Sequence, residues 1–265
     1  MKLSIFAYTL LFLTFPIILA SCDEDGINPY DKGSIKIEFD NRFGAEDLQL
    51  NTDYVNSSGE TFRITKLNYY ISNIKLSTTS GTEFIVAQDS SYFLIMEEHD
   101  DSHVITINNV PAGDYNEVTF TIGVDSLRST MDISKRTGVL DPAQGHDGMY
   151  WTWNSGYIFF KMEGTSPAAP ADQENKFYYH IGGYGGYDSP TLNNIREATI
   201  SLGSARAEVR SNKSPQIHFH ADLQNLFKSP TQFKIADHSL VMFSDFSTNI
   251  SNNYANMFRY DHVHN

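Results

Sequence analysis

The chain has 265 residues, with 32 acidic and 19 basic side chains, which gives a formal net charge of −13. Nucleic-acid binding needs a basic surface that neutralises phosphates, so this composition argues against nucleic acid as a partner. Cys22 is the single cysteine of the chain, which excludes an intramolecular disulfide framework.

The N-terminus has the features of a bacterial secretory signal. An apolar run over residues 3–19 follows Lys2, and small residues precede Cys22. The Leu-Ala-Ser-Cys ending at 19–22 resembles a lipobox, in which the cysteine is acylated and becomes the mature N-terminus. We predict a signal peptide over 1–21 and a lipid anchor on Cys22; the alternative is an uncleaved membrane anchor.

An acidic stretch follows Cys22 directly. Residues 22–33 contain the acidic run 23–25 and then Gly26, Pro29 and Gly33, which predicts a tether. An acidic segment in this place resembles the surface-export signal of some Gram-negative lipoproteins, and the alternative is a solvated linker. The sequence thus predicts an outer-membrane lipoprotein that faces the periplasm or is exported to the cell surface.

Period-two alternation dominates the remaining chain. Apolar and polar residues alternate over 35–40, 118–124 and 198–202, and residues 67–76 form a longer aromatic run. Such alternation is typical of strands that bury one face. Turn residues punctuate these segments, and no internal repeat or composition shift divides them. We predict one all-β domain over 34–265, an antiparallel β-sandwich.

Helical periodicity is confined to short segments near the C-terminus. Asp222 is placed to cap a short helix that carries Leu223, Leu226 and Phe227. Residues 251–260 could form another, with Tyr254, Met257 and Phe258 on one side. The prediction is therefore one or two short helices in this part of the chain.

Histidine spacing suggests a metal site. In a strand over 217–222, His218, His220 and Asp222 share one face, about 6.6 Å apart along the strand. The alternative is a polar solvent face. His262-Val263-His264 repeats the spacing, with a disordered tail as its alternative. Imidazole suits copper, zinc, iron or nickel, whereas thioether selects Cu(I).

Both tryptophans of the chain lie in one segment, and this segment carries a resemblance. The string GMYWTWNSGYIFFKMEG at 148–164 resembles the hallmark of the MbnP-like family of copper-binding proteins. Further segments resemble the family in the same order, namely 67–74, 110–115, 122–126, 138–142, 179–183 and 256–258.

The resemblance implies a β-sandwich and a copper site. It implies that a tryptophan, Trp151 or Trp153, is oxidised to kynurenine by a dihaem cytochrome peroxidase-type partner and ligates copper together with histidines. Indole N–H is only a donor, whereas ring opening frees an amine and a carbonyl that can bind a metal. The other tryptophan would relay electrons or line the site. The alternative for both tryptophans is packing in the core.

The candidate metal residues follow from these two lines of argument. Met149 lies beside the tryptophans, and His180 belongs to a matching family segment. His218 and His220 rest on strand spacing alone, and His264 lies where the family also ends with histidine. The set is Trp151, Trp153, Met149, His180, His218, His220 and His264.

We therefore predict a non-catalytic, membrane-anchored copper-binding lipoprotein that scavenges or stores copper. The alternative is a metal-free surface module that binds a glycan or a protein through Tyr178, Tyr179, Tyr184 and Tyr187. A third interpretation is a redox enzyme that uses protein-bound copper, although the sequence contains no motif that names a substrate.

Overall fold

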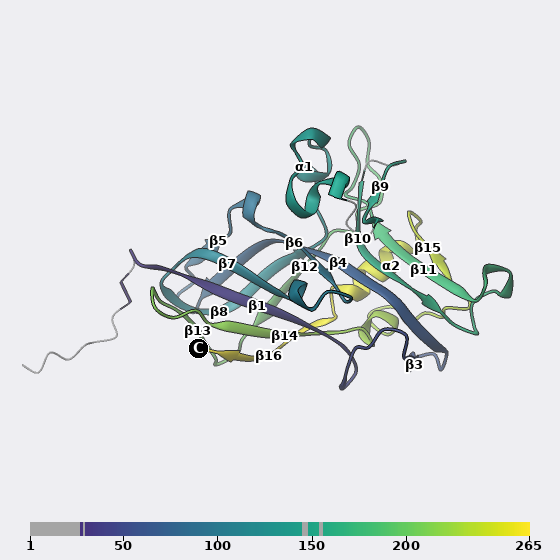
Figure 1. Cartoon of the computed structure of the whole chain (residues 1–265), viewed down its shortest axis with the longest axis horizontal. Coiled ribbons are helices and arrows are strands. Elements are labelled where there is room, and N and C mark those ends of the chain that lie inside the picture. The colour runs from purple at the N-terminus through teal and green to yellow at the C-terminus, as the bar shows by residue number, and fades with distance from the viewer. Residues whose placement is uncertain (1–26, 29, 145–147, 154–155) are drawn as a thin grey trace, which may run out of the picture.

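The computed structural model describes residues 27–28, 30–144, 148–153 and 156–265 (Figure 1). The signal peptide over 1–21 and Cys22 lie outside these residues, so their assignments stay predictions. Strand β1 begins at Lys32, inside the predicted tether. Within the described residues, no helix is both long and apolar enough to cross a bilayer.

Most of the described chain is β-structure, as the period-two alternation predicts. The strands are β1 (Lys32–Phe43), β2 (Glu46–Asp47), β3 (Asp53–Val55), β4 (Thr61–Thr78), β5 (Glu83–Ile85), β6 (Tyr92–Met96), β7 (Val104–Pro111), β8 (Gly113–Ile122), β9 (Tyr150–Trp151), β10 (Gly156–Thr165), β11 (Lys176–Gly182), β12 (Arg196–Ser201), β13 (Ala207–Val209), β14 (Gln216–Asp222), β15 (Leu240–Val241) and β16 (Phe258–His264). The α-helices are α1 (Ser126–Ser129) and α2 (Ser247–Tyr254), and short 3₁₀ turns occur between strands.

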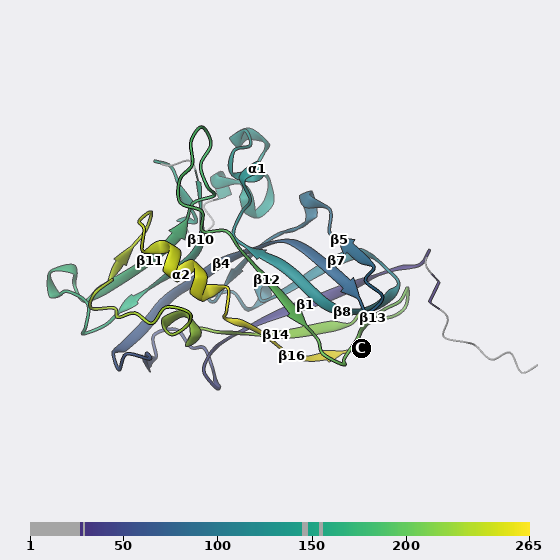
Figure 2. The same cartoon turned by 180° about the vertical axis from the view of Figure 1, so that it is seen from behind.

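The strands form two curled sheets (Figure 2). The five-stranded sheet has the order β16-β14-β1-β2, and β7 also pairs with β1. The 11-stranded sheet has the order β12-β8-β4-β10-β11-β15, with β13 on β8, β9 on β10, and β3, β5 and β6 on β4. The long strand β4 therefore organises the larger sheet, and β1 and β14 form the centre of the smaller one.

Both sheets are mixed, so the prediction of a purely antiparallel sandwich is wrong. Strand β1 pairs with β14 in parallel, from Lys36 opposite Gln216 to Arg42 opposite Asp222. Strand β11 also pairs with β15 in parallel. Hairpin neighbours must be antiparallel, but β1 and β14 lie far apart in the chain and a long connection permits either direction.

The two sheets enclose an aromatic core. Ile35, Ile37 and Phe39 point inward from β1 and are fully buried, as their alternation predicts. The Phe39 ring meets Phe120 of the larger sheet at a centroid distance of 5.5 Å and Phe258 of β16 at 6.0 Å. Because the inward residues are apolar, the alternating polar side chains of β1, β14 and β16 face outward together.

The C-terminal segment differs from the sequence prediction. Helix α2 covers Ser247–Tyr254, whereas residues 258–264 form strand β16 and not a helix or a free tail. The backbone of this segment pairs with β14, and Phe258 is buried in the core. These tertiary contacts stabilise the strand more than the weak helical periodicity would stabilise a helix. Asp222 ends β14, and a 3₁₀ turn over Asn225–Phe227 takes the place of the predicted capped helix.

Candidate functional site

The tryptophan segment lies on the larger sheet, where Trp151 pairs with Gly156 of β10. Trp151 is 6% exposed, whereas Trp153 is 65% exposed. Their rings are in contact, with centroids 5.3 Å apart, and both adjoin Phe243. The two tryptophans therefore differ, because Trp151 is inserted into the protein and Trp153 covers it from the solvent side. Residues 145–147 and 154–155 are outside the described chain.

Gly182 makes room for the Trp151 ring. A Cβ atom at this position of β11 would lie 2.7 Å from a ring carbon of Trp151 and 2.3 Å from the Tyr157 carbonyl oxygen. Gly183 has a φ of +106°, and a Cβ there would meet the Phe243 ring at 2.8 Å. The glycine pair thus allows the indole and Phe243 to pack directly on backbone.

His180 lies two residues before Gly182 on β11, so both positions face the same side of the strand. Its Nε2 is 2.7 Å from Glu163 Oε1 on β10, and the Lys161 Nζ is 3.5 Å from the same oxygen. The hydrogen bond with His180 lowers the pKa of Glu163, so this carboxyl is ionised at neutral pH. The His180 ring is therefore held by Glu163, and its strand position lies one repeat from Gly182, on which Trp151 packs.

Among the described residues of β9, β10 and β11, His180 is the imidazole available for a metal. Met149 is 1% exposed and belongs to an apolar cluster around Tyr70, Leu140 and Tyr157. An intact indole cannot serve as a ligand.

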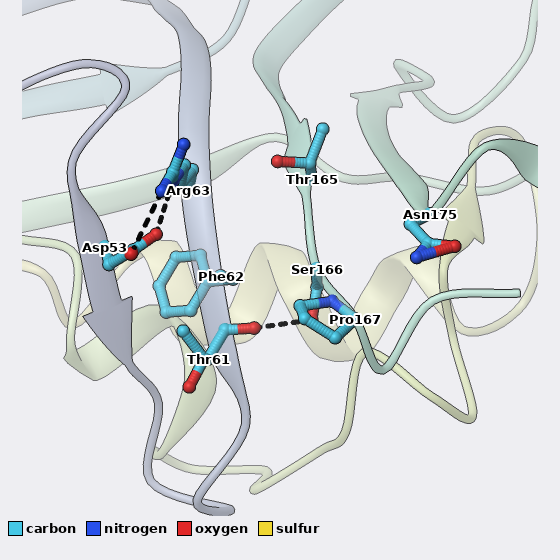
Figure 3. Close-up of a pocket in the computed structure, with 8 residues that line it drawn as sticks. All are labelled: Asp53, Thr61, Phe62, Arg63, Thr165, Ser166, Pro167 and Asn175. Atoms are coloured by element: carbon cyan, nitrogen blue, oxygen red, sulfur yellow. Dashed lines mark hydrogen bonds and ion pairs between the residues drawn. The ribbon is translucent and has the colours of Figure 1, made fainter. Parts of the chain in front are cut away.

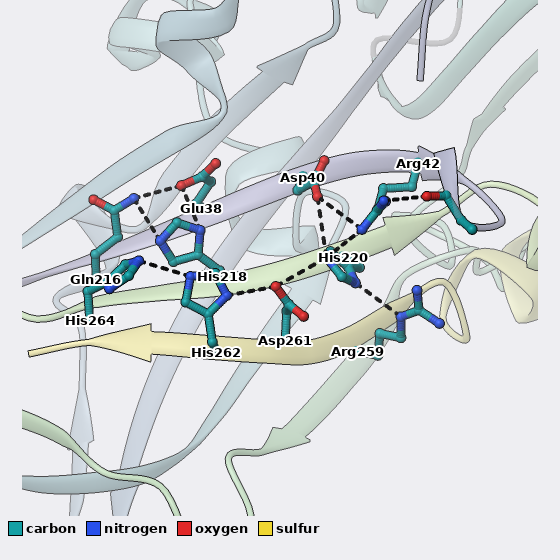
Figure 4. A network of polar contacts seen from close by, with 11 residues as sticks. Glu38, Asp40, Arg42, Gln216, His218, His220, Arg259, Asp261, His262 and His264 are labelled. Atoms are coloured by element: carbon teal, nitrogen blue, oxygen red, sulfur yellow. Dashed lines mark hydrogen bonds and ion pairs between the residues drawn. The ribbon is translucent and has the colours of Figure 1, made fainter. Parts of the chain in front are cut away.

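A second group of predicted residues lies on the smaller sheet (Figure 4). His218 of β14 and His262 and His264 of β16 each offer a ring nitrogen, and these atoms all lie within 4.8 Å of one another. The His218 ring stacks on His262 at 4.1 Å, and both rings lie nearly perpendicular to His264. His262 Nε2 and His264 Nε2 are 3.0 Å apart.

Strand register brings these three rings together. His218 pairs with His262 and Gln216 pairs with His264, but the next pair is Phe219 with Tyr260. This shift leaves Asp261 as the additional residue of a β-bulge. A bulge redirects side chains, and Asp261 consequently contacts His262 instead of facing the core.

Carboxylates bind the outer nitrogens of two rings. His218 Nδ1 is 3.0 Å from Glu38 Oε2, and His262 Nδ1 donates to Asp261 Oδ2 over 2.7 Å. Each contact fixes the tautomer in which Nε2 carries a free lone pair. Burial lowers the pKa of the His218 ring, and the Glu38 carboxylate only partly offsets this effect. His218 is therefore neutral at neutral pH, the form that binds metals.

His220 supports this cluster without joining it. Its ring nitrogens are 3.0 Å from Arg42 Nη1 and 3.3 Å from Arg259 Nε. His220 Nε2 also lies 3.3 Å from Asp261 Oδ2 and 3.4 Å from Asp40 Oδ2. The ring therefore helps to hold Asp261 beside His262.

The structure thus divides the predicted metal residues between two sheets. Trp151 and His180 belong to the larger sheet, with Met149 and Trp153 on either side of β9, and His218, His220 and His264 belong to the smaller sheet. Sequence reasoning left His262 out of the candidate set, although the repeated His-x-His spacing was its signal. The prediction that His218, His220 and Asp222 face away from Ile217, Phe219 and Ala221 agrees with the complete burial of those three residues.

Two of the cavities in the described part of the chain lie along these sheets. One, of about 310 Å³, lies at the ends of β3, β4 and β10 and is bounded by the Arg63–Asp53 ion pair (Figure 3). It contains none of the predicted site residues. The other, of about 530 Å³, is lined by Glu38, Asp40, Asp47, Glu97, Asp100 and His103, and therefore opens beside the imidazole cluster.

Comparison with known proteins gives one family and one related structure. The profile of the MbnP family matches residues 32–245. The solved structure of MbnP from Methylosinus trichosporium aligns with a TM-score of 0.55 and 14% identity, over 81% of this chain and 82% of that one. No curated protein matches the sequence significantly. The family match covers Trp151 and His180 and stops before His262 and His264. The chain belongs to the MbnP family.

Proposed function

We propose that this chain is a copper-binding lipoprotein of the MbnP family that scavenges or stores copper. Copper is bound beside β11, by His180 and by a kynurenine formed from Trp151. The observation that carries this proposal is the burial of Trp151 against Gly182, one strand repeat from His180, within the family-matched residues. Trp153, exposed at the surface, serves as a cover for the site.

The modification requires an oxidant. Cleavage of the indole C2–C3 bond adds two oxygen atoms, and hydrolysis then removes C2 as formate, leaving an aryl amine and a ketone. A dihaem peroxidase-type partner with peroxide as the oxygen source would perform the oxidation. The contact of Trp153 with both solvent and Trp151 offers this partner an electron path to the buried ring.

Native protein is the material for the test. The full chain should be released from its host's membranes after growth with copper, and its copper content measured. Stoichiometric copper in wild type, its loss in Trp151→Phe and His180→Ala, and an oxidised Trp151 in the peptide 146–161 would support the proposal. Copper-free protein from copper-replete cells would refute it.

The anchor has a separate test. Acylation should make the protein fractionate with outer membranes and incorporate labelled fatty acid, since several acyl chains together give stable anchoring. Cys22→Ala should abolish the label. Labelling that persists in this variant would contradict the lipid assignment without affecting the copper site.

The alternative of a metal-free recognition module finds less support. Tyr179 is fully buried in the core, and Tyr184 packs against the apolar cluster that contains Trp151. Tyr187 is 75% exposed. The four tyrosines therefore do not share the exposed face that stacking on a glycan requires.

A further inference from the structure

We infer that His218, His262 and His264 form a second metal centre, separate from the proposed copper site, which binds a divalent cation of borderline softness such as Zn²⁺ or Cu²⁺. This inference does not rest on the proposed function. It rests on the positions of three nitrogens, on the carboxylates behind them and on the charge around them.

The spacing of the nitrogens is already close to that of a metal site. Metal–imidazole bonds of about 2.0–2.1 Å place two ligand nitrogens of a tetrahedral ion roughly 3.3 Å apart. His262 Nε2 and His264 Nε2 are 3.0 Å apart. One ring nitrogen from each of the three histidines lies within 4.8 Å of the corresponding nitrogens of the other two. The His218 nitrogen therefore has to move toward the other two by at most about 1.5 Å when an ion binds.

Carboxylates behind the rings hold His218 and His262 in the way that metal-binding histidines are usually held. Metal-binding histidines usually donate their second N–H to a carboxylate or carbonyl, and Glu38 and Asp261 have this role for His218 and His262. Both carboxylates are themselves held, Glu38 by the Gln216 amide over 2.6 Å and Asp261 by His220. Histidines on an ordinary polar surface would not need carboxylates that are themselves held by further side chains.

Charge and ligand type favour a divalent ion. Two carboxylates lie behind the imidazoles, and one of them, Glu38, also lines the acidic cavity, so the surroundings are rich in negative charge. The three converging donors are all imidazole nitrogens. Imidazole suits zinc and copper(II), whereas copper(I) selects sulfur ligands.

Gln216 and the solvent adjoin the imidazole cluster. Gln216 Nε2 lies 3.2 Å from His218 Nε2, so this amide occupies the ligand lone pair in the metal-free protein and must turn aside when the ion binds. The side chain of His262 is 45% exposed, which leaves an entry path from outside. Three protein nitrogens and an open position resemble an exchangeable site more than a closed structural one.

This centre is distinct from the tryptophan site. The imidazoles belong to β14 and β16 of the smaller sheet, whereas Trp151 and His180 belong to β9 and β11 of the larger sheet. Strands β16 and β9 lie well apart in Figure 1. His262 and His264 also lie beyond residue 245, where the family match ends.

Titration of the full chain, purified in detergent and stripped of metal, tests the inference. Zn²⁺ alone is added and followed by calorimetry, and Co²⁺ is used to record the absorption bands of tetrahedral coordination. We expect one ion per chain. His218→Ala and His264→Ala should each weaken binding by more than about 100-fold, since loss of an outer partner alone costs 10–100-fold. His99→Ala, at an exposed histidine outside the cluster, is the matched control.

Further variants separate this centre from the copper site. Trp151→Phe should keep Zn²⁺ binding, and His218→Ala protein from the native host should keep its copper. Circular dichroism and the conservative His218→Gln variant show whether lost binding reflects misfolding. Absence of Zn²⁺ and Co²⁺ binding in folded wild type, or equal affinity in His218→Ala and His99→Ala, would overturn the inference.

Discussion

The tryptophan site and the imidazole cluster differ in how completely the unmodified chain builds them. At the cluster, three imidazoles already converge, and carboxylates fix the tautomers of two of them. At the tryptophan site, the described chain offers one imidazole, on β11, and a buried indole that cannot bind metal. A site made from encoded ligands is ready on folding, whereas a site that needs a modified side chain depends on another protein.

The sharpest test of this contrast is Trp151→Phe. Phenylalanine retains an apolar ring against Gly182 but cannot yield an amine and a ketone. We expect copper in native protein to fall to near zero, while Zn²⁺ binding at the imidazole cluster is unchanged. Metal analysis of the same preparation measures both. Parallel loss of both metals would mean that the two regions are one functional unit.

Recombinant protein made without the oxidising partner should separate the two regions without any mutation. The imidazole cluster should bind Zn²⁺ at full stoichiometry, because its ligands are encoded. The tryptophan site should remain copper-free, and peptide mass analysis should show intact Trp151. Full copper occupancy with unmodified tryptophan would refute the dependence on kynurenine.

Removal of one outer carboxylate should have an intermediate effect. Glu38→Gln leaves the three imidazoles in place but removes the anion that accepts from His218 Nδ1. We expect Zn²⁺ affinity to fall about 10–100-fold. Glu163→Gln, at the carboxylate that contacts His180, serves as its counterpart on the larger sheet and should leave Zn²⁺ affinity unaltered.

Packing of the tryptophan site can be tested through stability. Gly182→Ala places a Cβ 2.3 Å from a carbonyl oxygen and 2.7 Å from the Trp151 ring, and should lower the free energy of unfolding by about 2–3 kcal/mol. Gly203→Ala meets no atom within 4 Å and carries only the strain of a left-handed backbone, about 1 kcal/mol. Denaturant titration compares them, and equal losses would contradict the close packing.

The last prediction concerns the pH dependence of stability and Glu97, which lines the acidic cavity. Burial raises its pKa to about 7 in the folded protein. The folded state therefore binds this proton more tightly than the unfolded state, so stability falls as the pH rises from the unfolded pKa of about 4.3 through 7. Glu97→Gln should flatten this part of the stability–pH curve in thermal unfolding. An identical slope in both proteins would contradict the shifted pKa.

The sequence determined much of the fold. Alternation predicts the β-class and the inward faces of Ile35, Phe39, Ile217 and Phe219, because burial of one strand face imposes a period of two. Alternation did not predict that β1 pairs with β14 in parallel. It also did not predict that residues 258–264 form strand β16, because the sequence pattern over 251–260 indicated a helix. Direction and pairing depend on contacts between segments far apart in the chain, which local periodicity does not contain.

The same limit applies to the sites. The hallmark string predicts the family and draws attention to Trp151 and Trp153 without deciding between them, because a specific local motif can be read without a structure. Which histidines converge depends on strand order, on the register of β14 with β16 and on the bulge at Asp261. These features separated His180 from His218, gave His220 a supporting role and brought His262 into the cluster. Sequence thus determined the available ligand types, and only the tertiary structure decided which of these side chains converge, because convergence depends on contacts between distant strands.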